Sequence, residues 1–131
     1  MAAFQNYLSL ENTMATKVEH SNDIVKYADG NVLTLINNYV TEERQGDFAD
    51  TGTEYIKVTN VAKDTGNPPI VTITACIDDT KYYQVTTYGS RKGQVAAAAP
   101  TSPSPSIFRV HKGSDGVWRV NAVTAEVKDK C

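Results

Sequence analysis

Apolar residues follow two different periods along this chain, and the period changes near residue 50. In the first segment Phe4, Tyr7, Leu8, Met14 and Val18 recur at roughly helical spacing, and polar residues fill the positions between them. This pattern predicts one long amphipathic helix at the start of the chain.

Two further helical stretches follow. The segment "SNDIVKYADG" offers Ser21 or Asn22 as a helix N-cap and Gly30 as a left-handed end, which predicts a short second helix. The segment "NVLTLINNYVTEERQGD" puts its apolar residues on one stripe, with Asn31 as a cap and Gly46 as the stop. We therefore expect three helices within residues 2–48.

The period then falls to two. Five segments are rich in Val, Ile, Thr and Tyr and end in turn-forming residues: "TEYIKVTNVAKD", "PPIVTITACIDD", "KYYQVTTYG", "SIFRVHKG" and "GVWRVNAVTAEV". They predict four or five antiparallel strands over residues 52–131, with Asp78 and Asp79 in a turn. No helical pattern separates the strands, which argues against a parallel βαβ fold.

Helices followed by a strand meander are typical of an α+β fold, in which a curved sheet covers the helices on one face. The 131 residues fit a single domain, residues 1–131. One connection differs from the short turns: residues 90–106, "SRKGQVAAAAPTSPSPS", are rich in Ala, Pro and Ser. Because small side chains bury little area and proline lacks an amide donor, we expect a long, exposed and flexible loop there.

Charge and hydropathy give no sign of a nucleic-acid partner, a membrane span or a signal peptide within this sequence. The formal net charge is −2 and the basic residues are scattered, which gives no electrostatic reason to expect nucleic acid or anionic lipid. No apolar run approaches the roughly 20 residues of a membrane span. The start "MAAFQNYLSLENT" lacks the pattern of a signal peptide, so we expect either a cytosolic protein or a leader and tether upstream of this sequence.

The chain has two cysteines, and they suggest a compartment. Cys76 falls on the strand face opposite the apolar residues of "VTITACID", and Cys131 follows a last strand that could run beside it. A bridge closing roughly 55 residues would stabilise the fold by about 4 kcal/mol and would imply export. The alternative is two unrelated thiols. We predict the disulfide.

The same residues carry a resemblance. The order "YADGNVLTLINNYVTEERQGD", a strand, "VTITACIDD", "YGS", a Pro/Ala loop, "GVWRV" and a closing cysteine resembles the NTF2-like secreted proteins and lipoproteins of actinobacteria and their phages. The resemblance spans nearly the whole chain, and it implies a cone of curved sheet around helices in an exported or lipid-anchored domain, generally without an assigned activity. This sequence lacks a lipid-acceptor cysteine near its start.

Candidate catalytic chemistry is sparse. Enzymes that resemble this fold place an acid and a base in the cone, and the sequence offers His111 as a base with Asp78 or Asp79. The other histidine, His20, is at a polar helix end and is expected at the surface. There is no nucleophile elbow, no phosphate-binding glycine loop and no cluster at metal-ligand spacing, so no cofactor or metal is predicted.

Tyrosines and two basic residues suggest binding instead. Tyr82 and Tyr88 share one strand face, and Arg109 shares another with His111. Our first hypothesis is a non-enzymatic extracytoplasmic domain that binds a protein partner, or a second copy of itself, through a sheet face. The alternative is a small-molecule pocket, possibly catalytic through His111. Ionisable side chains such as His111 and Arg109 converging inside the cone would favour the pocket.

Overall fold

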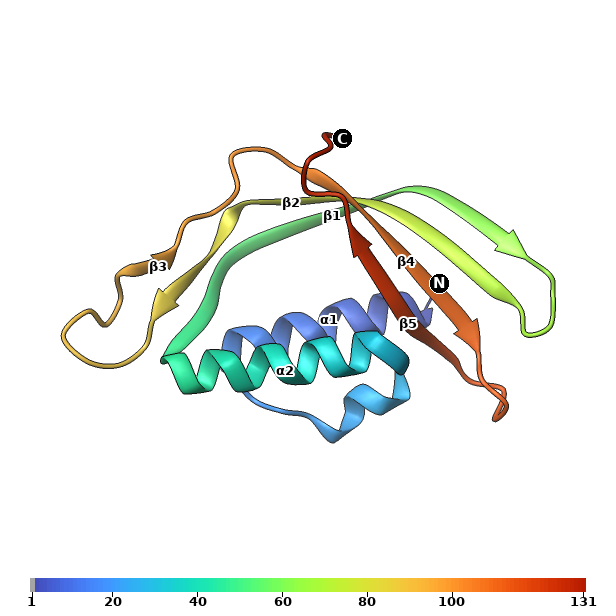
Figure 1. The fold of residues 1–131 in the computed structure, drawn as a ribbon, viewed down its shortest axis with the longest axis horizontal. Helices are drawn as coiled ribbons and strands as arrows, with labels where there is room; N and C mark the ends of the chain where they lie inside the picture. The colour runs from blue at the N-terminus through green and yellow to red at the C-terminus, as the bar shows by residue number, and fades with distance from the viewer. Residues whose placement is uncertain (1) are drawn as a thin grey trace.

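Helices lie across the concave side of a curved antiparallel sheet in the computed structural model, which describes residues 2–131 (Figure 1). The helices are α1 (Ala2–Lys17), the 3-10 helix η1 (Asn22–Lys26) and α2 (Gly30–Gly46). The strands are β1 (Phe48–Asp64), β2 (Ile70–Thr86), β3 (Val95–Ala97), β4 (Ser104–Lys112) and β5 (Trp118–Ala125). The α+β class and the order of helices before strands are confirmed.

The predicted helical segments are all present, although their boundaries differ. The second segment is a 3-10 helix, and Ser21 caps it by accepting a hydrogen bond from the Asp23 amide. Gly30 begins α2 instead of ending the second helix. Its φ is +56°, and a Cβ at this position would lie 3.0 Å from the Asn121 carbonyl oxygen, so the site needs glycine. Asp47 ends α2 in the left-handed conformation.

The sheet has the order β1-β2-β4-β5, and β3 pairs with β2 beyond the end of β4. The prediction of a turn at Asp78 and Asp79 is wrong, because both residues belong to the 17-residue strand β2. The true hairpin of this region joins β1 to β2 at residues 65–69. β1 and β2 therefore run side by side along the whole curved sheet (Figure 1).

A β-bulge explains why the Asp-Asp sequence was mistaken for a turn. Thr53 of β1 pairs with Lys81 of β2, and the next pair joins Tyr55 to Asp78. One residue of β1, Glu54, therefore lies opposite two residues of β2. A bulge of this kind bends the strand and shifts its alternation by one residue, so that residues of different parity reach the same face.

The apolar core lies between the helices and the middle of the sheet. Phe4 of α1 meets Phe108 of β4 edge to face, with ring centroids 4.9 Å apart. The alternation predicted for β2 is confirmed, because Val71, Ile73 and Ala75 are buried. The remaining buried side chains of this core are Tyr7, Met14, Ile24, Ala28, Val32, Ile36, Val40, Val110 and Val120.

The predicted disulfide is present. Cys76 joins Cys131, with their Cα atoms 5.8 Å apart. The bond ties the segment after β5 to the convex face of β2, because Cys76 alternates with the buried residues of that strand. The Glu126 amide also donates to the Pro105 carbonyl, so the segment is held at two points.

The segment expected to be a long exposed loop contains regular structure. Its residues are mostly exposed, and β3 within it pairs with β2 through Ala97 opposite Gln84. Within residues 2–131, no helix combines the length and the apolar character that crossing a bilayer requires.

The disulfide gives a first prediction. Cys131→Ser is expected to lower the free energy of unfolding by about 2–4 kcal/mol, because the unfolded chain regains the freedom of a 55-residue loop. Urea denaturation measures the change. Reductant should destabilise the wild-type protein by a similar amount and leave Cys131→Ser unaffected. If wild-type protein and Cys131→Ser were equally stable without reductant, the disulfide would not stabilise the fold.

Candidate functional site

A cavity of about 610 Å³ lies between the helices and the part of the sheet formed by β1, β2 and β3. Leu35 and Tyr39 of α2 line it and are substantially exposed, so the cavity opens to solvent beside α2. Ala97, Ala98 and Pro100 form its wall on the side of β3. Its size lies within the range of about 300–1,000 Å³ that is typical of small-molecule sites.

Carboxyl groups from three elements line this cavity. Glu11 comes from α1, Asp50 and Glu54 come from β1, and Asp79 comes from β2. A fifth acid, Glu43 of α2, lies behind the wall.

The bulge in β2 assembles this wall. Asp79 and Tyr82 are separated by an odd number of positions, so in a regular strand they would point to opposite faces. Because Glu54 lies opposite two β2 residues, Asp79 and Tyr82 both line the cavity. Asp78 stabilises the bulge, since its Oδ1 accepts hydrogen bonds from the amide of Thr80 at 3.0 Å and from the hydroxyl of Thr80 at 2.6 Å.

One acid pair lies at the α2 side. Glu43 is 1% exposed, and its Oε2 accepts a 3.5 Å hydrogen bond from Gln84. Its Oε1 has no donor within the described residues. Burial, together with a hydrogen bond to the Asp50 carboxyl, raises the pKa of Glu43 to about 8. Tyr39 donates to Asp50 at 2.7 Å.

A second acid pair lies at the bulge. Burial and a hydrogen bond to Asp79 raise the pKa of Glu54 to about 8. The pKa of Asp79 is itself raised, chiefly by burial, and its buried Oδ1 has no hydrogen-bond partner among residues 2–131. Between the two pairs, burial and the charges of Asp50 and Asp79 raise the pKa of Glu11 to about 7.

Tyrosine hydroxyls complete the polar part of the wall. Tyr7 and Tyr82 line the cavity together with Tyr39, and Tyr82 accepts a 3.4 Å hydrogen bond from Asn12. Burial and the neighbouring carboxyl groups raise the pKa of all three phenols, so they remain neutral. They present hydroxyl groups and aromatic faces to the cavity without adding charge.

The acids of the cavity have no basic neighbours in its wall. Among residues 2–131, no Lys, Arg or His side chain lines the cavity. The ion pairs of this part of the chain involve Asp23, Asp29 and Asp115 instead. Across the same range, no three His, Cys, Asp or Glu side chains converge closely enough to hold a metal ion. The carboxyl groups instead surround a space large enough for an organic molecule.

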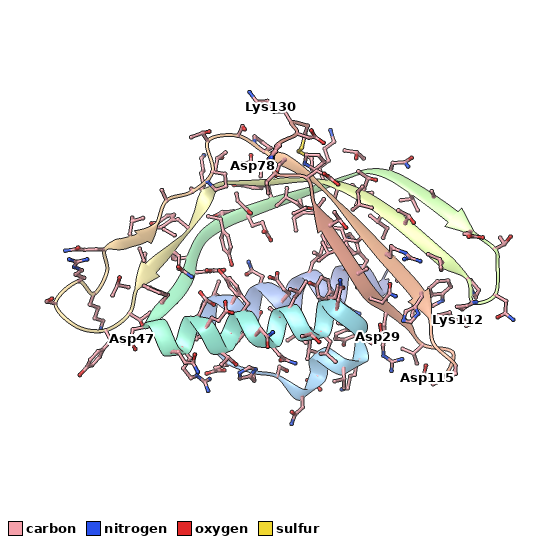
Figure 2. All side chains as sticks on the ribbon, viewed as in Figure 1. Asp29, Asp47, Asp78, Lys112, Asp115 and Lys130 are labelled. Atoms are coloured by element: carbon pink, nitrogen blue, oxygen red, sulfur yellow. A yellow bond between two sulfur atoms is a disulfide. The ribbon has the colours of Figure 1, made fainter. Side chains whose placement is uncertain are left out.

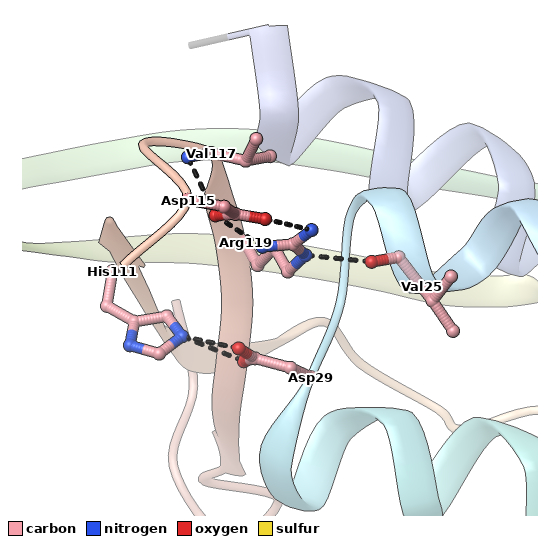
Figure 3. Close-up of polar contacts among 6 residues, drawn as sticks. All are labelled: Val25, Asp29, His111, Asp115, Val117 and Arg119. Atoms are coloured by element: carbon pink, nitrogen blue, oxygen red, sulfur yellow. Dashed lines mark hydrogen bonds and ion pairs between the residues drawn. The ribbon is translucent and has the colours of Figure 1, made fainter. Parts of the chain in front are cut away.

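His111 is placed far from this cavity. Its Nε2 lies 2.7 and 2.9 Å from the carboxylate oxygens of Asp29, at the junction between η1 and α2 (Figure 3). His111 pairs with Ile70, and Asp78 lies eight residues further along β2, or roughly 26 Å at about 3.3 Å per residue. The suggested pairing of His111 with Asp78 or Asp79 is not formed.

Most of the other site residues predicted from the sequence also lie outside the cavity. Asp78 lies on the convex side of the sheet, away from the helices (Figure 2). Arg109 is exposed, and Tyr88, at 76% exposure, projects from the turn after β2. Of the predicted binding residues, Tyr82 alone lines the cavity. His111 contributes to structure, as does Arg119, which joins Asp115 and the Val25 carbonyl (Figure 3).

The sequence reasoning missed four of the five acids. Glu11, Glu43, Asp50 and Glu54 lie in three different elements, and no motif links them. One signal was available: Tyr39 belongs to the apolar stripe of α2, and Glu43 follows Val40 by three residues, so it lies on the same buried face. An acid on an apolar stripe marks a buried polar site.

Comparison with known proteins supports the fold alone. No protein-family model matches the chain, and no curated protein sequence matches it. Among solved structures, the intermembrane space region of the chloroplast protein ARC6 is similar, with a TM-score of 0.63 and 12% sequence identity. The match covers 95% of this chain and 91% of the other. At this identity the two proteins share an architecture, and the likeness carries no function.

The buried acids predict an unusual pH dependence of stability. Glu43 and Glu54 have ordinary pKa values of 4.5 and folded values of about 8, so the folded protein binds more protons than the unfolded chain between these limits. The free energy of unfolding should therefore fall as the pH rises from about 5 to about 8. Urea denaturation at a series of pH values measures this slope.

Glu43→Gln should flatten the slope and raise the stability near pH 8 by on the order of 1 kcal/mol, because the amide keeps the shape and removes the buried charge. Glu42→Gln is the matched control, since Glu42 is the exposed neighbour on the same helix. The interpretation is wrong if both variants keep the wild-type slope, or if the wild-type protein becomes more stable toward pH 8.

Proposed function

We propose that this chain is an extracytoplasmic, NTF2-like domain that binds a small organic molecule in the cavity between its helices and its curved sheet. The observation that carries the proposal is the cavity of about 610 Å³, which is lined by tyrosines and carboxyl groups next to the apolar side chains Leu35, Ile36 and Val123. Apolar walls with a few polar groups are typical of ligand sites.

The arrangement of the wall supports binding. A bulge is maintained in β2, and five acids are buried or half-buried without a basic partner in the wall. Burying acids without counter-charges reduces stability, so a purely structural role does not account for the acid cluster. A ligand that occupies the cavity would give these groups a partner.

The disulfide supports the extracytoplasmic part of the proposal, because such bonds persist in oxidising compartments. A secreted or surface-anchored location remains the expectation from the sequence resemblance. The helices packed against a curved antiparallel sheet are consistent with an NTF2-like cone. The solved structure of similar fold comes from an intermembrane space region, which is also outside a cytosol.

Partner binding through a sheet face is the second candidate, and the observation in its favour is the apolar exposure of the edge strand β1. Tyr55 is 58% exposed and Val61 is 50% exposed. Tyr55 lies across from Asp78 on the convex face, whereas Val61 lies across from the buried Ile73 on the concave face. Because these residues do not share a face, we place this candidate below the cavity.

A fragment screen tests the proposal. We would titrate the isotope-labelled protein with cationic, neutral and anionic fluorinated fragments and follow backbone amide shifts. Binding compounds are expected to move the amides around Glu54, Asp79 and Tyr82, because these residues form the cavity wall. Shifts confined to the Asp29 and His111 end, or to no region, would overturn the proposal.

A blocked cavity provides the mutational test. Ala98→Phe is expected to weaken binding of the best fragment by about tenfold or more, because the ring would occupy space at the wall. Ala98 is exposed, so the fold should tolerate the change. Ala125→Phe is the control, since this exposed alanine lies at the end of β5 outside the cavity. Equal losses in both variants would contradict binding in the cavity.

A further inference from the structure

We propose that two copies of this chain form a symmetric dimer, in which the outer edges of their β1 strands pair antiparallel with Val61 at the twofold axis. The free edge of β1 and the self-complementary order of its side chains carry this inference. It is independent of the proposed ligand, because the paired segment, residues 57–64, contributes nothing to the cavity wall.

The outer edge of β1 is unpaired. β1 is the first strand in the order of the sheet, and β2 is its one neighbour there. Among residues 2–131, no backbone hydrogen bond from any element other than β2 reaches residues 57–64. Alternate residues of this segment therefore present their amide and carbonyl groups to solvent, and an edge of this kind is a template for another strand.

The side chains of this segment are exposed as well. All residues from 57 to 64 are exposed, and the hairpin end of β1 and β2 projects past the N-terminal end of α1 (Figure 1). Val58 and Val61 lie across from the buried Ala75 and Ile73, so both are on the concave face. A neighbouring strand would remove part of these apolar, β-branched side chains from water.

A second bulge, in β1 itself, determines which residues share a face. Thr59 has no partner on β2, because the register of the two strands shifts between Val58 and Asn60. Its hydroxyl donates to the Thr74 carbonyl at 3.2 Å, which holds the shift in place. Val58 and Val61 therefore lie on one face although their separation is odd. A strand that pairs with the outer edge has to leave the same residue unpaired.

A second copy of β1 meets this condition when the twofold axis passes through Val61. Antiparallel pairing requires that opposite residues lie on the same face, and every pair in this register does so. Thr59 of each copy is left unpaired. From the axis outward, the pairs are Val61 with Val61, Asn60 with Ala62, Val58 with Lys63, and Lys57 with Asp64.

Charges are complementary in this register. Lys57 and Asp64 both lie on the convex face, and among residues 2–131 neither forms an ion pair. The Oδ1 of Asp64 accepts a 2.9 Å hydrogen bond from the Gly66 amide, which leaves the other oxygen for Lys57 of the second copy. The symmetry of the dimer produces this contact twice, and opposite charges across a strand pair stabilise the pairing.

The same register avoids contacts between lysines, which commonly prevent edge strands from pairing. Without the bulge at Thr59, a register centred on Asn60 would set Lys57 against Lys63. With the bulge, Lys57 meets a carboxylate and Lys63 lays its methylene groups along Val58.

Analytical ultracentrifugation of the full chain tests the inference, at an ionic strength of about 0.15 M. We expect a reversible dimer with a Kd of about 10–100 μM, because one strand edge buries less than the roughly 1,600 Å² of a standard interface. A protein that stays monomeric up to about 500 μM would overturn the inference.

Charge reversal tests the register. Lys57→Asp and Asp64→Lys are each expected to weaken dimerisation by about tenfold or more, because like charges then face each other twice. The double variant restores opposite charges and should return the Kd to within about threefold of the wild-type value. Lys92→Asp is the control, since this exposed lysine lies in the turn after β2. Circular dichroism checks that all variants are folded.

Cross-linking locates the axis. Val61→Cys should give a covalent dimer with a short thiol-reactive cross-linker, because opposite Cβ atoms in an antiparallel pair are about 4.5–5.5 Å apart. Ala62→Cys should cross-link less, since Ala62 meets Asn60 and not its own copy. The native cysteines do not interfere, because they are joined within one chain. Equal cross-linking of the two variants, or a dimer that none of the charge reversals weakens, would place the contact on another surface and overturn the inference.

Discussion

The one-residue bulge in β2 is the feature on which the rest of the structure depends. Without it, Asp79 and Tyr82 would lie on opposite faces of the sheet. The bulge places both on the concave side and bends the strand pair over α2. Gly52 permits the close approach, since a Cβ there would collide with the Lys81 carbonyl oxygen. The same bulge therefore contributes to the curvature and to the composition of the cavity wall.

The apolar core and the acid-lined cavity occupy different parts of the molecule. Beneath β4 and β5 the interior is apolar, with Phe4 against Phe108, and the junction before α2 is fastened by Asp29 and His111. Beneath the bent ends of β1 and β2 the interior holds acids that repel one another. Such a cluster persists because the apolar end and the disulfide stabilise the fold independently of it. The raised pKa values of Glu11, Glu43 and Glu54 favour their neutral forms, which reduces the repulsion.

Sequence reasoning succeeded where a local pattern determines the structure. Helical and alternating periods identified the helices and the strands β1, β4 and β5, and the parity of Cys76 identified the face from which the disulfide forms. It failed at Asp78 and Asp79, because acidic pairs are common in turns and a bulge within a long strand has the same local composition. The acid cluster escaped notice because its members are brought together by tertiary contacts alone.

The two aspartates at the bulge have opposite environments and different roles. Asp78 and Asp79 are neighbours in sequence with the same chemical group, yet the pKa of Asp78 is lowered by its hydrogen bonds to Thr80, and the pKa of Asp79 is raised by burial. The first therefore stays ionised and holds the backbone in its bulged form, while the second turns into the cavity beside Glu54. One dipeptide thus builds the distortion and contributes a carboxyl group to the site that the distortion creates. A turn at this position would have left both groups in solvent, outside the cavity.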